Sequence, residues 1–131
     1  MTRPEPPLTP RSASYWQSGA DGTLRLATCR SCGWRMHPPQ PICPRCRQTE
    51  IAFEPVSGKG HIQSWTINRY PWSKGLTPPY LIVEVELVEQ PGLLVMTNLV
   101  GCALDAAHIG MPVEVTFEHV GDTWIPDFRP C

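Results

Sequence analysis

Two C-x-x-C pairs, separated by ten residues, constrain this chain more than any other feature of its sequence. The pairs are Cys29/Cys32 and Cys43/Cys46. A C-x-x-C turn places two thiolates on one side of a tight backbone knuckle, and two facing knuckles form a tetrahedral cage of four sulfurs for Zn²⁺. Because protein thiolates fill all four positions of such a cage, we expect a structural zinc ion rather than a catalytic one.

Other interpretations of the four cysteines fit the sequence less well. Disulfides would need an oxidising compartment, and the first residues lack the apolar stretch of a secretory signal, so we expect a cytoplasmic protein. A redox-active C-x-x-C usually accompanies a helix that follows a strand, whereas these pairs lie among Pro, Gly and Arg. Iron in a rubredoxin-like site stays open, because the same geometry accepts either metal.

The residue directly after each cysteine pair is one that the knuckle often needs in a left-handed backbone conformation. Gly33 comes directly after the second thiolate, where a positive φ is often needed and glycine adopts it without strain. Arg47 holds the matching place in the second pair. A left-handed backbone at that arginine would cost about 1 kcal/mol.

Composition and pattern predict a mainly β chain in three parts. The 131 residues include 16 prolines and 10 glycines, which argues against long helices, and no apolar run approaches the length of a membrane span. Residues 1–21 are predicted to be an extended or disordered tail and a short helix that Ser12 caps and that ends near Gly19. Residues 22–55 are predicted to form the zinc ribbon, which needs its metal to fold. Residues 56–131 are predicted to form a separate barrel.

Alternation of apolar and polar residues with period two predicts the strands. In the ribbon they are residues 22–29 and 51–56, and beyond it 58–69, 80–88, 93–100, 111–118 and 123–128. Gly58 and Gly60 would let the first barrel strand coil sharply. Residues 102–108 form at most a short helix. Three strands, a short helix and two strands is the order of an OB-fold, a five-stranded Greek-key barrel; a small antiparallel sandwich fits the same strand count.

An ordered set of short motifs resembles a known family. After the Trp-bearing helix come Leu24-Arg-Leu, the two cysteine pairs with Pro38-Pro39 between them, Ser57-Gly58-x-Gly60, Pro79-Tyr80 and Ile109-Gly110-Met111. In this order the chain resembles the zinc-ribbon OB-fold family formerly labelled DUF35, the acyl-CoA-associated proteins, over nearly its full length after residue 12. Arg47 departs from the glycine often found after the last cysteine of that family.

The resemblance implies a non-catalytic accessory subunit. Members of the family pair with thiolase-superfamily proteins, including thiolases and lipid-transfer-protein-type aldolases. Some are fused to, or occur beside, MaoC-like enoyl-CoA hydratases in steroid side-chain degradation. The residues agree with this picture, because they show no nucleophile–base set and no paired carboxylates. His37, His61, His108 and His119 are scattered, and we expect them to be surface or capping residues.

The proline-rich loop after the first barrel strand holds the candidate contacts with acyl-CoA and with a partner. Its aromatic and apolar residues Tyr70, Trp72 and Leu76, together with Trp16 of the N-terminal helix, are predicted to bind the partner protein. Arg69 and Lys74 are candidates to contact the phosphates of CoA. We expect a hetero-oligomer and no membrane association.

The alternative function is binding of single-stranded nucleic acid, which both zinc ribbons and OB barrels can perform. The ribbon does carry Arg30, Arg35, Arg45 and Arg47. The barrel segment, however, has four basic residues against eight carboxylates. A groove that follows phosphates should not be acidic, so nucleic acid is the less favoured partner.

Overall fold

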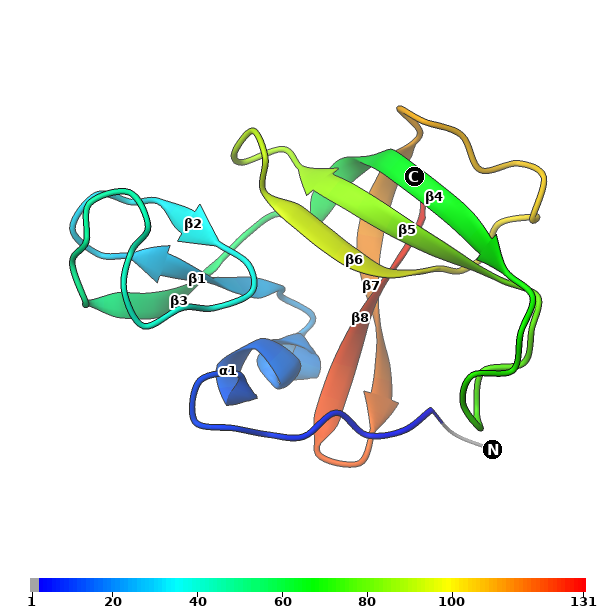
Figure 1. Ribbon diagram of the computed structural model, residues 1–131, viewed down its shortest axis with the longest axis horizontal. Coiled ribbons are helices and arrows are strands. Elements are labelled where there is room, and N and C mark those ends of the chain that lie inside the picture. Colours follow the sequence, from blue (N-terminus) through cyan, green and yellow to red (C-terminus); the bar gives the residue numbers. More distant parts are fainter. Residues whose placement is uncertain (1–2) are drawn as a thin grey trace.

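The computed structural model describes residues 3–131 and shows two small β-sheets side by side (Figure 1). A short helix α1 (Ala13–Trp16) and a 3₁₀ turn η1 (Ser18–Asp21) precede them. The first sheet has the order β2-β1-β3, formed by β1 (Arg25–Cys29), β2 (Arg35–Met36) and β3 (Ile51–Pro55). The second is a closed barrel of order β4-β5-β6-β8-β7, formed by β4 (Lys59–Asn68), β5 (Tyr80–Leu87), β6 (Leu94–Leu99), β7 (Pro112–Val120) and β8 (Thr123–Pro130).

The barrel, rather than a sandwich, is therefore the correct architecture. Along β5, residues alternate strictly between partly exposed and buried, with Leu81, Val83, Val85 and Leu87 inside. β6 and β8 close the ring through one parallel pair, Leu99 with Phe128, and Phe128 is fully buried at this seam. None of the helices among the described residues is long and apolar enough to cross a bilayer.

Glycine allows the first barrel strand to bend between its two neighbours. Gly60 pairs with Leu87 of β5 on one side and with Val113 of β7 on the other. A Cβ atom at this position would collide with the Glu86 carbonyl and the Val85 side chain. Gly58, just before the strand, has a φ of +75°, a conformation that glycine adopts without strain. Both glycines thus serve the coiling expected of them.

One helical expectation needs correction, and a second resolves to a turn. Ser12 does not cap α1 with its side chain; its hydroxyl bonds to Thr9 instead, at 2.8 Å. Residues 102–108 form no helix, only a turn in which the Ala106 N–H donates to the Ala103 carbonyl at 3.0 Å. Leu104 and Ala107 pack against the barrel core. Gly101 and Gly110, which flank the segment, both have a left-handed backbone conformation, with φ values of 65° and 89°.

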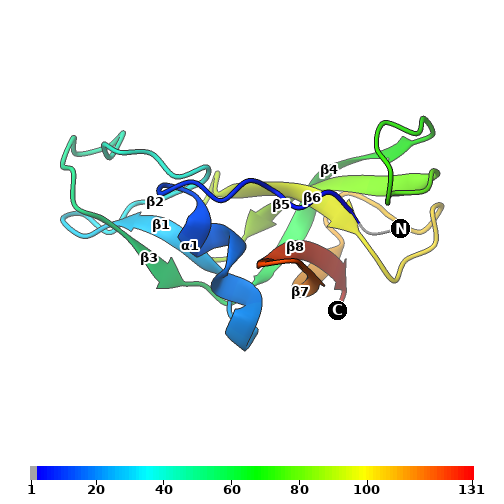
Figure 2. The same cartoon turned by 90° about the horizontal axis from the view of Figure 1, so that it is seen from below.

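The N-terminal tail is extended, and long-range contacts hold it from Arg3 onward. The Arg3 guanidinium donates to Asp127 at 2.7 Å, to Glu118 at 2.9 Å and to Asn98 at 3.0 Å. These residues belong to β8, β7 and β6, so the tail runs across the closing seam of the barrel (Figure 2). Because the ion pair spans 124 positions of sequence, local composition did not reveal it. The disordered alternative is therefore wrong for the described part of the tail.

The ribbon and the barrel are joined by specific contacts. Gln90, in the turn between β5 and β6, bonds through its side chain to both backbone groups of Arg35 in β2, at 3.0 and 2.8 Å. The ring of His37 packs on that of Tyr15, with centroids 4.6 Å apart, and burial lowers the pKa of His37 to about 4. His37 is thus a junction residue, and its assignment to the surface was wrong. His61, His108 and His119 are exposed.

Candidate metal centre

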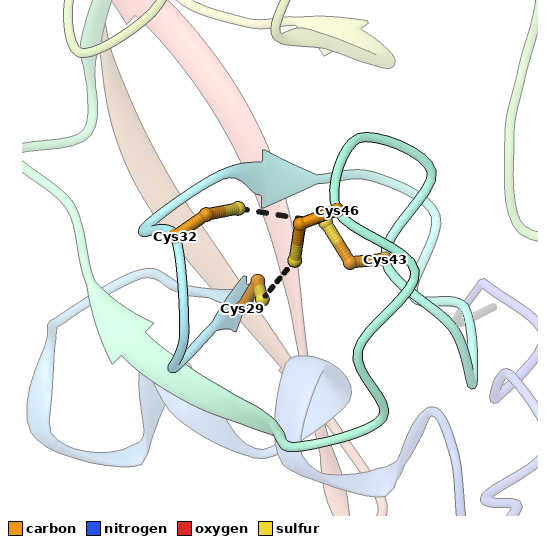
Figure 3. A group of neighbouring side chains, drawn as sticks. All are labelled: Cys29, Cys32, Cys43 and Cys46. Atoms are coloured by element: carbon orange, nitrogen blue, oxygen red, sulfur yellow. Dashed lines mark hydrogen bonds between the residues drawn. The ribbon is translucent and has the colours of Figure 1, made fainter.

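The four cysteine sulfurs converge on one point at the end of the ribbon (Figure 3). All four Sγ atoms lie within 4.8 Å of one another, with 3.5 Å between Cys29 and Cys46 and 3.7 Å between Cys32 and Cys43. Zn–S bonds of about 2.3 Å in a tetrahedron place sulfurs about 3.8 Å apart. The cage therefore fits Zn²⁺, whereas a disulfide needs an S–S distance of about 2.0 Å.

The two knuckles repeat the same backbone pattern. The carbonyl of Cys29 accepts from the Gly33 N–H at 2.8 Å, and the carbonyl of Cys43 accepts from the Arg47 N–H at 3.0 Å. The φ values of Gly33 and Arg47 are 78° and 67°. Arg47 thus takes up the left-handed conformation that the second knuckle demands, at a cost of about 1 kcal/mol. The departure from glycine leaves the knuckle geometry intact.

Backbone amides and the neighbouring thiols set the ionisation of the cage. Hydrogen bonds from the amides of Cys32 and Ser31 lower the pKa of Cys29 to about 6. At Cys46 the Gln48 amide lowers the pKa, but burial and the three neighbouring thiols outweigh it and raise the pKa to about 12. The last sulfur therefore ionises readily only when a cation compensates the charge, so metal binding and thiol deprotonation are linked.

Four arginines lie within three residues of a cage cysteine in the sequence: Arg30, Arg35, Arg45 and Arg47. The Arg45 guanidinium lies over the Trp34 ring, 5.2 Å from its centroid, and the backbone N–H of Arg45 donates to the Cys43 sulfur at 3.4 Å. Arg30 lies 3.7 Å from Glu54 of β3. A zinc ion bound by four thiolates would carry a net charge of −2, and the arginines give the same short segment a compensating positive charge.

The candidate partner loop presents two aromatic rings to solvent. Trp72 is 73% exposed and Tyr70 60% exposed, and their ring centroids lie 4.6 Å apart. The Trp72 indole donates to Asn68 Oδ1 at 2.8 Å, while the Asn68 amide donates to the Tyr70 carbonyl at 2.6 Å. Asn68 was not singled out from the sequence, although an amide four residues before a loop tryptophan is a usable signal. It holds both aromatic residues in place.

The other candidate residues divide between this loop and the core. Arg69 and Lys74 are exposed, and Leu76 is half-buried. Lys74 and Leu76 line a hollow of about 480 Å³ inside the loop, between Pro71 and Pro78. Trp16 lies apart from them: it packs edge-on against Tyr15 at 4.9 Å and against the barrel core. The structure thus groups Arg69, Tyr70, Trp72, Lys74 and Leu76 in one loop and leaves Trp16 outside it.

A four-sulfur ribbon joined to a closed five-stranded barrel defines a zinc-ribbon OB-fold protein. Comparisons with known proteins agree: the rubredoxin-like zinc ribbon model of ChsH2 matches residues 16–52, and the model of its C-terminal OB-fold domain matches residues 53–118. The chain belongs to this ChsH2 family of DUF35 proteins. The predictions of family, fold and structural zinc are thereby confirmed.

Two similar proteins carry descriptive names. A "DUF35 domain-containing scaffold protein" of Methanothermobacter thermautotrophicus is 36% identical over 102 residues, which are 74% of this chain and 73% of the relative. A "probable enoyl-CoA hydratase alpha subunit" of Thermomonospora curvata is 33% identical over 130 residues, 98% of this chain. The chain spans only 40% of the length of that second relative.

A solved structure is similar over almost the whole chain. It is described as "Ltp2-ChsH2(DUF35) aldolase", and it superposes with a TM-score of 0.86 at 31% sequence identity. The match covers 96% of this chain and 98% of the solved one. The relative position of ribbon and barrel described above is therefore shared with a protein that carries the DUF35 name.

Proposed function

We propose that this chain is a non-catalytic accessory subunit that binds a thiolase-superfamily partner and supports its acyl-CoA chemistry. The observation that carries the proposal is the full-length similarity to the Ltp2-ChsH2(DUF35) aldolase chain. Relatives named as scaffold proteins support a role without chemistry of its own. The hydratase name belongs to a relative of which this chain spans 40%, so hydratase activity is not part of the proposal.

The partner surface in this proposal is the Tyr70–Trp72 pair. Asn68 and the prolines of the loop hold the two rings before any partner arrives, so docking orders few additional bonds. Tryptophan and tyrosine are favoured anchors of protein interfaces, and a buried anchor contributes about 2 kcal/mol or more. Trp72 forms no part of the barrel core, which leaves its ring available to a partner.

Arg69 and Lys74 provide the link to acyl-CoA in this proposal. Both are exposed and lie on the same loop as the aromatic pair. The 3′-phosphate and pyrophosphate of CoA are anions that such cations attract, with a strength that falls as salt concentration rises. A CoA thioester held by the partner would meet these side chains at the edge of the shared interface.

The decisive experiment compares Trp72→Ala with Val88→Ala, which removes an equally exposed apolar side chain (66%) from the turn after β5. Each variant is mixed with a lipid-transfer-protein-type thiolase-like aldolase, and binding is measured by calorimetry. We expect Trp72→Ala to weaken the complex at least tenfold and Val88→Ala to leave it unchanged. In the lone chain, both should change the free energy of unfolding by less than about 0.5 kcal/mol.

Two results would count against the proposal. If the wild-type chain binds neither such an aldolase nor a thiolase, the accessory role is wrong. If Trp72→Ala binds as tightly as wild type, the role stands but this anchor does not.

The purified chain alone is expected to show no turnover of acyl-CoA thioesters. Thioester hydrolysis, hydration and carbon–carbon cleavage can each be followed by chromatography of the CoA products. Steady turnover that a single substitution abolishes would reveal a catalytic site and contradict the accessory role.

A further inference from the structure

On one edge of β4, backbone hydrogen bonding stops partway along the strand. Its other edge pairs with β5 from Gly60 to Asn68, but on the β7 side pairing is confined to Lys59, Gly60 and His61. The backbone of Ile62 bonds to Gly110 and Met111. Beyond Ile62, no backbone hydrogen bond on that side is found within residues 3–131. Residues 63–68, named here the open edge, thus carry backbone donors and acceptors without a protein partner.

Burial along β4 changes where the open edge begins. The strand alternates up to Ile62, and then four consecutive residues, from Gln63 to Thr66, are exposed. Trp65 is 38% exposed, although Val83, its partner across the sheet, is fully buried. A register shift at Gln63 accompanies the change. The indole of Trp65 therefore stands at the point where β4 leaves the closed part of the barrel.

The open edge lacks the usual protection of exposed strands. Proteins blunt such edges with charged side chains or proline, because unpaired edges recruit other strands. The stretch Gln63-Ser-Trp-Thr-Ile-Asn68 contains neither. A shallow groove of about 280 Å³ lies beside it, lined by Ser64, Trp65, Thr66, Ile82, Val83, Glu84 and Met96. Met96 is 67% exposed.

Cations follow directly where the open edge ends. Arg69 is the next residue, and Lys74 lies further along the same loop. Neither forms an ion pair within the described chain, in contrast to Arg3, Arg25, Arg30 and Arg129. Figure 1 places this loop at the end of the barrel away from the ribbon. An occupant of the edge would therefore meet free positive charge at one end.

We propose that the open edge receives an extended segment of the partner protein as an added β-strand, with a carboxylate of that segment facing Arg69 or Lys74. The inference rests on the proposed accessory function and specifies how the partner is held. Main-chain hydrogen bonds supply affinity in such an arrangement, and alternate side chains supply specificity. Here one row of side chains would pack on Trp65, and the other would lie over Ser64 and Thr66, at the side of the groove that belongs to β4.

Charge favours the partner over a second copy of this chain. Residues 61–68 contain no Asp or Glu, so the same edge of a second copy would bring no carboxylate to Arg69. An acidic residue on a partner strand would pair with a cation that otherwise stays solvated. Side-chain docking onto Trp72 alone would leave the edge amides exposed to water.

Amide hydrogen exchange, resolved by residue, tests the proposal on the full chain alone and in complex with the thiolase-like aldolase. The amides of residues 63–68 that do not face β5 should exchange rapidly in the lone chain and at least 100-fold more slowly in the complex. The outer edge of β3 is the matched control, since β3 pairs only with β1, and its exchange should not change.

Arg69→Met should weaken binding and reduce its salt dependence, whereas Arg11→Met, at another exposed arginine, should do neither.

The outcomes separate the edge from the accessory role. A complex that protects Tyr70 and Trp72 but leaves residues 63–68 exchanging freely overturns the added strand and spares the accessory role. Protection that grows with the concentration of the lone chain shows a second copy on the edge and also overturns the proposal. Absence of any complex refutes the accessory role itself.

Discussion

The ribbon and the barrel are stabilised by different means within one short chain. The ribbon core consists of Ala27, Cys29, Met36 and Cys43, so half of its buried residues are cage cysteines. The barrel core is larger and almost entirely apolar, including Ile62, Val83, Val85, Val95 and Phe128. Apolar burial contributes about 25 cal/mol per Å², which suffices for the barrel. The ribbon has too little such area and depends on metal binding instead.

One strand separates these two cores. In β1 and the one residue before it, Leu24 and Leu26 belong to the barrel core, whereas Ala27 and Cys29 belong to the ribbon core. Side chains of successive residues in a strand point to opposite faces. β1 therefore contributes one face to the metal cage and the other face to the apolar core of the barrel. The two regions are joined through this shared strand.

Loss of a cage cysteine should have the largest effect, because it should unfold the ribbon and leave the barrel folded. Cys43→Ser is expected to abolish zinc binding and unfold residues 27–52, since a structural zinc supplies on the order of 10 kcal/mol of folding free energy. Amide signals of the barrel should stay dispersed in NMR spectra while those of the ribbon collapse. Cys102→Ser, at a cysteine outside the cage, is the control and should retain one zinc per chain by elemental analysis. A Cys43→Ser protein that is folded throughout and keeps its metal would contradict the assignment.

The next largest effect should come from Arg3, which stabilises the barrel seam rather than the ribbon. Arg3→Met leaves the Asp127 carboxylate, 5% exposed, without its counter-charge. We expect a loss of about 3 kcal/mol in the free energy of unfolding, measured with urea. Adding Asp127→Asn should recover part of the loss, because the buried charge is then gone. Arg11→Met should change stability by less than about 0.5 kcal/mol; an equal effect of the two arginine substitutions would argue against the seam contact.

His37 should give the smallest of these effects, at the junction of the two regions. Its pKa in the folded chain is about 4, below the ordinary value near 6.5, so the unfolded chain binds more protons between these pH values. The contribution of neutral His37 is therefore complete above about pH 6.5 and is lost as the pH falls toward 4. Between pH 7 and 5, wild type should lose about 2 kcal/mol more than His37→Gln.

Thermal unfolding of both proteins across this range measures the difference directly. The comparison cancels the acid sensitivity of the cage, which the two proteins share. His108→Gln, at an exposed histidine, should follow wild type. Parallel pH profiles for wild type and His37→Gln would show that the ring of His37 is solvated.

Much of the fold could be predicted because its signals are local. Cysteines three residues apart must share a knuckle, and alternation along residues 80–88 identifies a strand without knowledge of its neighbours. Residues 102–108, expected to form at most a short helix, form only a turn, and the reason is tertiary. Leu104 and Ala107 pack against the barrel core, and that requirement outweighs the weak helix preference of so short a segment.

The sequence by itself determined the zinc cage, the mainly β character and the order of the strands, because these follow from spacing and periodicity over a few residues. Only the tertiary structure decided that Arg3 meets Asp127, that Gln90 pairs with the backbone of Arg35, and that His37 packs on Tyr15. It also decided that the barrel pairing on the β7 side of β4 ends at His61 and leaves an edge open. These contacts join residues far apart in the chain, and their free energy depends on how the closed barrel brings distant side chains together, which no local pattern encodes.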